Sequence, residues 1–217
     1  VSEFSRQRIL DWAGVTPESV INVGNGVGPE YSPDGDSADL GFCYLLCVGN
    51  RKGHKNEVRV IQAFAQAKID SKIRLVFTGS ASKNLEYIAK THNVLERIVF
   101  LGRVSDEEMP ALYRGSIALI FPSLYEGFGL PVIEAMACGI PVLTSNVTAL
   151  PEVAGDAAML VDPTSTEQIA NGITEIVSNN QLRNFLIHKG LIRATLFSWD
   201  SVANKVKKVF DETFETM

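Results

Sequence analysis

Short apolar segments alternate with amphipathic segments along most of this sequence, and that alternation constrains the fold more than any other feature. Most of the apolar segments are continuously apolar rather than alternating, which is typical of strands covered on both faces. The alternation predicts right-handed βαβ crossovers, and therefore an α/β fold with a parallel sheet and helices on both faces. We expect strands at Val20–Val23, Cys43–Val48, Ile73–Phe77, Ile98–Leu101, Ile117–Phe121, Pro141–Thr144 and Ala158–Val161.

Helical periodicity fills the gaps between these predicted strands. Pro131 at the start of one such segment and Gly139 just after its end show the usual asymmetry of helix termini. After residue 180 the sequence holds two more helical patterns and no predicted strand. The other predicted helices cover residues 3–13, 56–69, 82–93, 105–114, 131–138 and 166–178.

Length, charge and cysteine usage exclude several classes of protein. A chain of 217 residues suits one large domain. Its net charge of −5 argues against a nucleic-acid partner, because phosphate neutralisation needs clustered Lys and Arg. Cys43, Cys47 and Cys138 lack metal-ligand spacing, so we expect buried thiols in a reducing cytoplasm and no zinc site. The first residues do not have the pattern of a signal peptide and the first residue is not Met, so we expect the chain to begin inside a longer protein.

The most informative segment is the glycine-rich turn at residues 122–131, between a predicted strand and a predicted helix. Ligands of open parallel sheets bind beyond the carboxyl ends of the strands, and a helix N-terminus there offers free N–H groups to phosphate. Gly127 and Gly129 would let a ligand approach the backbone. Glu126 would face that ligand. Glu134 could accept hydrogen bonds from a ribose diol, although a glutamate in a first helical turn can also simply complement the helix dipole.

A second strand-to-helix turn, Gly49–Asn56, carries basic side chains. Arg51 and Lys55 could neutralise a diphosphate at the same edge of the sheet, and the alternative is a solvated loop. The turn lacks the spacing and the final Ser or Thr of a P-loop. The segment Gly24–Gly28 looks like a dinucleotide fingerprint, but it runs into the Pro-containing segment 29–33, which cannot open a helix.

Together these segments resemble the GT-B fold retaining glycosyltransferases of family 4, the glycosyl transferases group 1. The resemblance covers residues 1–210 and is carried by the Glu-x7-Glu element within 122–142, Phe100–Val104, Gly49–Asn56, Ala149–Val153 and Phe197–Asp200. It implies one Rossmann-like half of a two-half enzyme, with the active site between the halves. Residues 1–30 would be the end of the amino-terminal half and the linker. Residues 31–198 would be the donor-binding domain, and 199–217 the crossover helix.

The resemblance also implies roles for individual residues. Lys55 would hold the donor diphosphate, and Arg51 would substitute for an arginine that the family often has at the place of Asn50. Glu126 would face the transferred sugar, Glu134 would bind the ribose hydroxyls, and Val104 would contact the base. The implied catalytic residues are Glu126, Lys55 and Arg51. The implied donor-binding residues are Gly49, Asn50, Arg51, Lys55, Gly79, Arg103, Val104, Tyr125, Glu126, Gly127, Phe128, Gly129, Leu130 and Glu134.

The implied function is retaining transfer of a sugar from a nucleoside-diphosphate sugar to a glycan or lipid-linked acceptor. A UDP-sugar is favoured because UDP-sugars are the commonest donors in the family, and no metal or cofactor is expected. Without the amino-terminal half we expect little or no transfer. Two alternatives are a GT-B nucleotide-sugar epimerase or hydrolase and a nonenzymatic Rossmann-type nucleotide-binding module.

The last predicted helix has an apolar stripe, which would cross back to the missing half or pack on the present domain. Its residues Lys205, Lys207 and Lys208 suggest a weaker alternative, peripheral contact with the inner face of a membrane.

Overall fold

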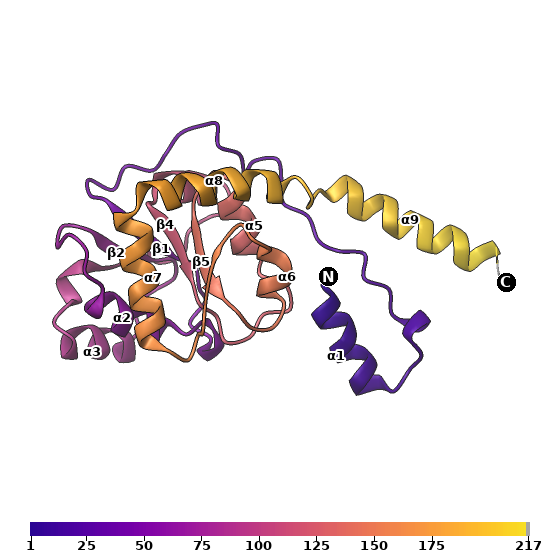
Figure 1. Ribbon diagram of the computed structural model, residues 1–217, viewed down its shortest axis with the longest axis horizontal. Helices are drawn as coiled ribbons and strands as arrows, with labels where there is room; N and C mark the ends of the chain where they lie inside the picture. Colours follow the sequence, from indigo (N-terminus) through magenta and orange to yellow (C-terminus); the bar gives the residue numbers. More distant parts are fainter. Residues whose placement is uncertain (216–217) are drawn as a thin grey trace.

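A fully parallel, six-stranded sheet forms the centre of the computed structural model, which describes residues 1–215 (Figure 1). The strand order is β3-β2-β1-β4-β5-β6. This sheet confirms the predicted α/β fold. Its strands are β1 (Tyr44–Cys47), β2 (Arg74–Phe77), β3 (Ile98–Phe100), β4 (Ala118–Phe121), β5 (Val142–Ser145) and β6 (Met159–Val161).

Helices cover both faces of this sheet, as the alternating pattern predicts. Successive side chains of a strand point to opposite faces, so Leu45 belongs to one buried cluster and Leu46 to the other. The helices are α1 (Glu3–Ala13), α2 (Glu57–Gln66), α3 (Lys83–Thr91), α4 (Met109–Gly115), α5 (Leu130–Ala137), α6 (Leu150–Ala154), α7 (Thr166–Ser178), α8 (Asn180–Ala194) and α9 (Trp199–Glu215). The Leu46 cluster includes residues of α4, α5 and α6, and the Leu45 cluster includes residues of α2, α3 and α7.

The order of the strands creates a switch point between β1 and β4. From β1 the chain adds β2 and β3 on one side, then returns to add β4, β5 and β6 on the other. In open parallel sheets, the loops that leave the two strands at such a point diverge and open a crevice at their carboxyl ends. The loop after β1 and the loop after β4 are the two turns that the sequence singled out.

Two expectations from the sequence are wrong. The segment Val20–Val23 is not a strand, because it lies outside the sheet, and the carbonyl of Val20 instead accepts a hydrogen bond of 2.6 Å from Arg6 Nε. Cys43 is exposed rather than buried, because it lies just before β1 begins, whereas Cys47 and Cys138 are buried.

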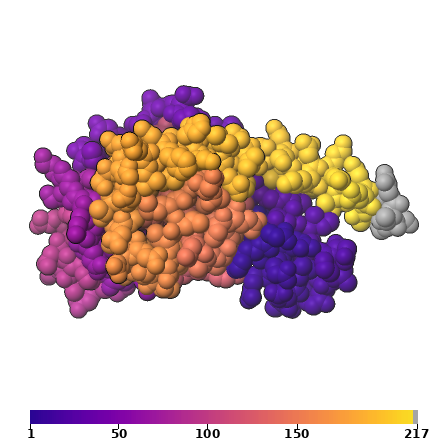
Figure 2. All heavy atoms as spheres, viewed as in Figure 1, coloured from indigo at the N-terminus to yellow at the C-terminus, as the bar shows by residue number. Residues whose placement is uncertain are grey.

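The two ends of the chain lie on one side of the sheet domain (Figure 1). Helix α9 projects beyond it, and the indigo N-terminal segment lies against the orange part of the body in Figure 2. In the predicted apolar stripe of α9, Val202, Val206 and Val209 are half-buried and Phe210 is 60% exposed, so the stripe is only partly covered. Within residues 1–215, no helix combines the length and the apolar character that crossing a bilayer requires. The boundaries 1–30, 31–198 and 199–217 stay a prediction, and residues 216–217 lie outside the described part of the chain.

Candidate functional site

A hollow of about 500 Å³ lies at the carboxyl ends of the strands around the switch point, and we call it the switch-point cleft. Loops after three neighbouring strands contribute to it, as does the first part of α5. This is where the parallel topology places a ligand. The lining residues are Tyr31, Val48, Gly49, Asn50, Thr78, Gly79, Ser80, Arg103, Val104, Asp106, Met109, Leu130, Pro131 and Glu134.

Gly79 ties two of these loops together. Its N–H donates a hydrogen bond of 2.6 Å to the carbonyl of Gly102, which joins the loop after β2 to the loop after β3. The φ angle of Gly79 is 84°, in the left-handed region that favours glycine. A side chain at this position would also meet the carbonyl oxygen of Gly49 at 3.2 Å. Glycine is therefore required for the close approach of the β1 and β2 loops beside the cleft.

Glu134 brings a carboxylate into the cleft from the second turn of α5. Burial raises the pKa of this carboxyl above its ordinary value, and the nearby Asp106 and Glu30 raise it further. The hydroxyl of Tyr113 opposes them, because it donates a hydrogen bond of 2.7 Å to Glu134 Oε2 and so stabilises the charged form. A partly buried carboxylate of this kind is suited to accepting hydrogen bonds from a ligand diol.

Tyr113 is a site residue that the sequence did not reveal. It lies in α4, is fully buried, and is 21 residues from the carboxylate that it contacts. The sequence placed it within a predicted helix, but no local pattern shows which neighbour a buried tyrosine hydroxyl reaches.

The two predicted turns meet at an ion pair. Lys55 Nζ lies 2.7 Å from Glu126 Oε1, and both side chains are largely buried. The same ammonium group lies 4.7 Å from the centroid of the Phe121 ring, which is within the range of a cation–π interaction. Close by, the N–H of Leu124 donates to the carbonyl of His54 over 2.7 Å. Lys55 is therefore held against the glycine-rich turn.

The glycine-rich turn presents free backbone donors where α5 begins. In the part of the chain that the structure describes, the N–H groups of Phe128, Gly129 and Leu130 have no hydrogen-bond partner. Gly129 precedes the helix with a φ of 102°, and a Cβ there would lie 2.6 Å from Leu150 Cδ2. The ring of Phe128 is buried against Phe197, with ring centroids 5.6 Å apart. We call residues 126–130 the donor loop, since its free N–H groups and the helix dipole favour an anion.

Arg51 is directed elsewhere. Its guanidinium pairs with Glu57 and donates to the carbonyls of Thr78, Gly79 and Ser80 over 2.7–2.8 Å. Neither Arg51 nor Lys55 is among the lining residues of the switch-point cleft. The predicted role of Arg51 as a ligand of the diphosphate stays a prediction, and the observed contacts assign it to joining the loops after β1 and β2.

The predicted site residues therefore fall into three groups. The cleft itself brings together Gly49, Asn50, Gly79, Arg103, Val104, Leu130 and Glu134. The donor loop and its ion pair bring together Lys55, Glu126, Gly127, Phe128 and Gly129. Arg51 is engaged with Glu57, and Tyr125 is half exposed and packs edge-on against Phe4. Among residues 1–215, no three His, Cys, Asp or Glu side chains gather as metal ligands would.

Comparison with known proteins identifies relatives of this chain. The family model of the glycosyl transferases group 1 matches residues 37–192. The O-antigen chain mannosyltransferase B of Escherichia coli is 31% identical over 220 residues, which cover 93% of this chain and 56% of that protein. The MMP alpha-(1->4)-mannosyltransferase of Mycolicibacterium hassiacum is 30% identical over 164 residues, which cover 73% of this chain and 40% of that protein. The chain thus spans about half the length of these curated relatives.

A solved structure supports the same relationship at the level of the fold. A glycosyltransferase from Rickettsia africae is 18% identical, with a TM-score of 0.89. The match covers 100% of this chain and 63% of that one. The fold of the whole chain is therefore the fold of about three fifths of that glycosyltransferase.

Proposed function

The chain belongs to the glycosyl transferases group 1 family, and we propose that it forms the part of a hexosyltransferase that binds a nucleoside-diphosphate sugar. The observation that carries the proposal is the carboxylate of Glu134 in a cleft that is also lined by Leu130, whose free N–H lies at the start of α5. A nucleotide sugar offers a diol to the carboxylate and a diphosphate to the helix N-terminus. One molecule can therefore satisfy both features.

In this proposal the base lies against Val104 and the loop after β3, at one end of the cleft. The ribose hydroxyls donate to Glu134. The diphosphate lies between the donor loop and the Gly49–Asn50 turn, and Glu126 faces the sugar. Each of these parts of the nucleotide sugar would then meet a group that the topology brings to the switch point.

The proposed roles of the charged groups follow from where charge develops during sugar transfer. Breaking the bond between the anomeric carbon and the phosphate leaves negative charge on the nucleoside diphosphate and positive charge on the sugar. Lys55 and the dipole of α5 would stabilise the departing phosphate, because preorganised donors in a water-poor site act most strongly on charge that appears in the transition state. Glu126 would place a carboxylate near the sugar. The acceptor would be a glycan or a lipid-linked glycan, bound with the help of the missing half of the enzyme.

The identity of the donor is open to direct measurement. The family resemblance favours UDP, because UDP-sugars are the commonest donors in the family. The two curated relatives described above are mannosyltransferases, so mannose is the sugar that we propose. Calorimetric titration of the chain with UDP, GDP and ADP, and then with the corresponding mannose nucleotides, should give heat for one base. No heat with any of them would overturn the proposal.

We also propose that transfer needs no metal, since Lys55 and the α5 N-terminus would supply the positive charge. Transfer by the complete enzyme should then be unchanged by excess chelator. The reaction products separate the alternatives: sugar released to water would indicate a hydrolase, and an isomerised nucleotide sugar would indicate an epimerase. Binding of NAD but of no nucleoside diphosphate would indicate a nonenzymatic module.

A further inference from the structure

Helix α1, at the start of the chain, contacts the donor loop directly. The hydroxyl of Ser2 donates a hydrogen bond of 2.6 Å to the carbonyl of Gly127, and the hydroxyl of Ser5 donates one of 2.8 Å to the same oxygen. The two serines are 125 and 122 residues from Gly127 in the sequence. Both lone pairs of one loop carbonyl are thus occupied by side chains from a single helix turn.

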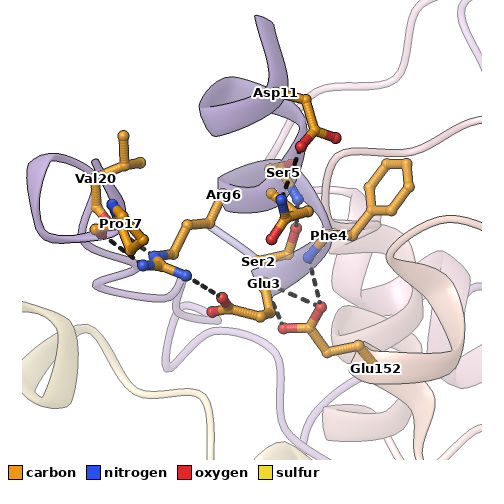
Figure 3. A network of polar contacts seen from close by, with 10 residues as sticks. Ser2, Glu3, Phe4, Ser5, Arg6, Asp11, Pro17, Val20 and Glu152 are labelled. Atoms are coloured by element: carbon orange, nitrogen blue, oxygen red, sulfur yellow. Dashed lines mark hydrogen bonds and ion pairs between the residues drawn. The ribbon is translucent and has the colours of Figure 1, made fainter. Parts of the chain in front are cut away.

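The N-terminus of α1 is built to hold these serines in place (Figure 3). Ser2 is the N-cap, is 1% exposed, and accepts a hydrogen bond of 3.0 Å from the N–H of Ser5. The carboxylate of Glu152, at the start of α6, accepts from the N–H of Glu3 at 2.7 Å and from the N–H of Phe4 at 3.2 Å. Free N–H groups at a helix N-terminus attract a carboxylate, so Glu152 fixes α1 against the body.

The residue that precedes the donor loop also contacts α1. The ring of Phe4 packs edge-on against the ring of Tyr125, with centroids 5.6 Å apart. A Cβ on Gly127 would lie 3.1 Å from Ser5 Oγ, so glycine at this position leaves the space that the serine needs.

The orientation of one carbonyl fixes the orientation of the next N–H. In a trans peptide the C=O and the N–H of the same unit point in opposite directions, and the Gly127–Phe128 peptide is trans. With its carbonyl turned toward α1, this peptide directs the N–H of Phe128 away from α1. That N–H is the first of the free donors at the start of α5.

We infer that Ser2 and Ser5 are positioning residues for the proposed diphosphate site: by holding the Gly127 carbonyl they orient the free N–H of Phe128 toward the diphosphate. The inference rests on the proposed function. It makes affinity for the diphosphate depend on a helix that lies outside the sheet domain. Contacts to the base and the ribose come from Val104 and Glu134, which α1 does not touch, so they are independent of it.

The test compares two ligands of the same base in the full chain. For whichever of UDP, GDP and ADP the chain binds, calorimetry measures the dissociation constants of the diphosphate and of the monophosphate. Loss of one hydrogen bond in Ser5→Ala should raise the dissociation constant of the diphosphate about fivefold, and Ser2→Ala/Ser5→Ala should raise it further. The monophosphate should change less than about twofold, since its contacts are retained. Ser5→Thr keeps the hydroxyl and should restore the wild-type ratio.

Ser19→Ala is the matched control, because that exposed hydroxyl contacts only Thr16 near the same helix. Equal weakening of both ligands in Ser5→Ala would mean a general structural effect and would overturn the inference, as would unchanged affinity for the diphosphate. If the double variant does not fold, the single variant decides. If the wild-type chain binds none of the nucleotides, the proposed function fails, and this inference fails with it. If the nucleotides bind normally and Ser5→Ala shows no selective loss of diphosphate affinity, only this inference fails and the proposed function stands.

Discussion

The hydroxyl of Tyr113 donates a hydrogen bond of 2.7 Å to Glu134 Oε2, and the tyrosine itself is fully buried. Burial raises the pKa of Glu134, whereas this hydrogen bond lowers it. A ribose needs the charged carboxylate as an acceptor. The tyrosine therefore favours the charged form of Glu134, which is the form that would bind a ribose in the proposed site, whereas burial favours the neutral form.

Replacing Tyr113 by Phe removes this one stabilising contact and leaves the burial of Glu134 in place. The pKa of Glu134 should rise further, so nucleotide affinity should begin to fall at a higher pH than in the wild type. At neutral pH the free energy of unfolding should fall by about 1–3 kcal/mol, the cost of losing a hydrogen bond to a charged group. Titrations between about pH 5 and 8 with a ribonucleotide and its 2′-deoxy analogue measure the effect. A pH profile that superimposes on that of the wild type would assign Tyr113 to packing alone.

Glu134→Gln should separate stability from binding. A carboxyl whose pKa is raised by folding contributes stability that is fully present below its ordinary value of 4.5 and is lost as the pH rises through the raised pKa. Glutamine does not titrate and its amide oxygen can still accept from Tyr113. The variant should therefore have the higher free energy of unfolding at neutral pH, with the difference shrinking as the medium becomes acidic, and should bind nucleotide more weakly.

Urea unfolding of both proteins at several pH values checks this prediction, with nucleotide affinity measured in parallel. A variant less stable than the wild type at neutral pH would show that Glu134 is satisfied by its surroundings. It would then be a structural residue rather than one held ready for a ligand.

The sequence predicts the sheet well, because fully buried parallel strands are continuously apolar and are separated by helices. Each of the six strands overlaps a predicted segment, as Cys43–Val48 overlaps β1. The same criterion fails at Val20–Val23. A short apolar run also suits a linker that packs one or two side chains, and no local signal reports whether a neighbouring strand is available.

The candidate site, like the fold, can be predicted from the sequence only in part. The glycine-rich turn and the Gly49–Asn56 turn are local motifs, and parallel topology brings them together. The Tyr113–Glu134 bond and the clamp of Ser2 on Gly127 join residues 21 and 125 positions apart, and neither contact has a periodicity or a motif of its own. The pairing of Arg51 with Glu57 likewise depends on side-chain direction, which loop composition does not determine.

The ion pair of Lys55 with Glu126 makes another prediction. Lys55→Ala would leave Glu126 largely buried without its counter-ion, so the free energy of unfolding should fall by about 2 kcal/mol. Lys55→Met/Glu126→Gln removes both charges and should recover most of that stability, but it should still bind the diphosphate weakly because the cation is missing. Chemical unfolding and calorimetry of Lys55→Met, of Glu126→Gln and of the double variant give the coupling energy.

Lys189 provides the matched control for this pair. It lies 2.8 Å from Asp156, but both side chains are well exposed, so Lys189→Ala should cost less than about 1 kcal/mol. Equal losses in Lys55→Ala and Lys189→Ala would show that the buried pair is no stronger than a surface pair. Unchanged diphosphate affinity in Lys55→Ala would remove Lys55 from the proposed site.

Arg51 is the residue for which sequence and structure suggest different roles. If Arg51 binds the diphosphate, replacing it would weaken diphosphate binding and leave the fold unchanged. If Arg51 instead joins Glu57 to the carbonyls of Thr78 and Gly79, replacing it would leave these acceptors unpaired. The free energy of unfolding would then fall by about 2–4 kcal/mol. We expect the second outcome for Arg51→Ala, with similar fractional losses of affinity for diphosphate and monophosphate. A selective loss of the diphosphate in a fully stable variant would restore the role that the sequence predicts.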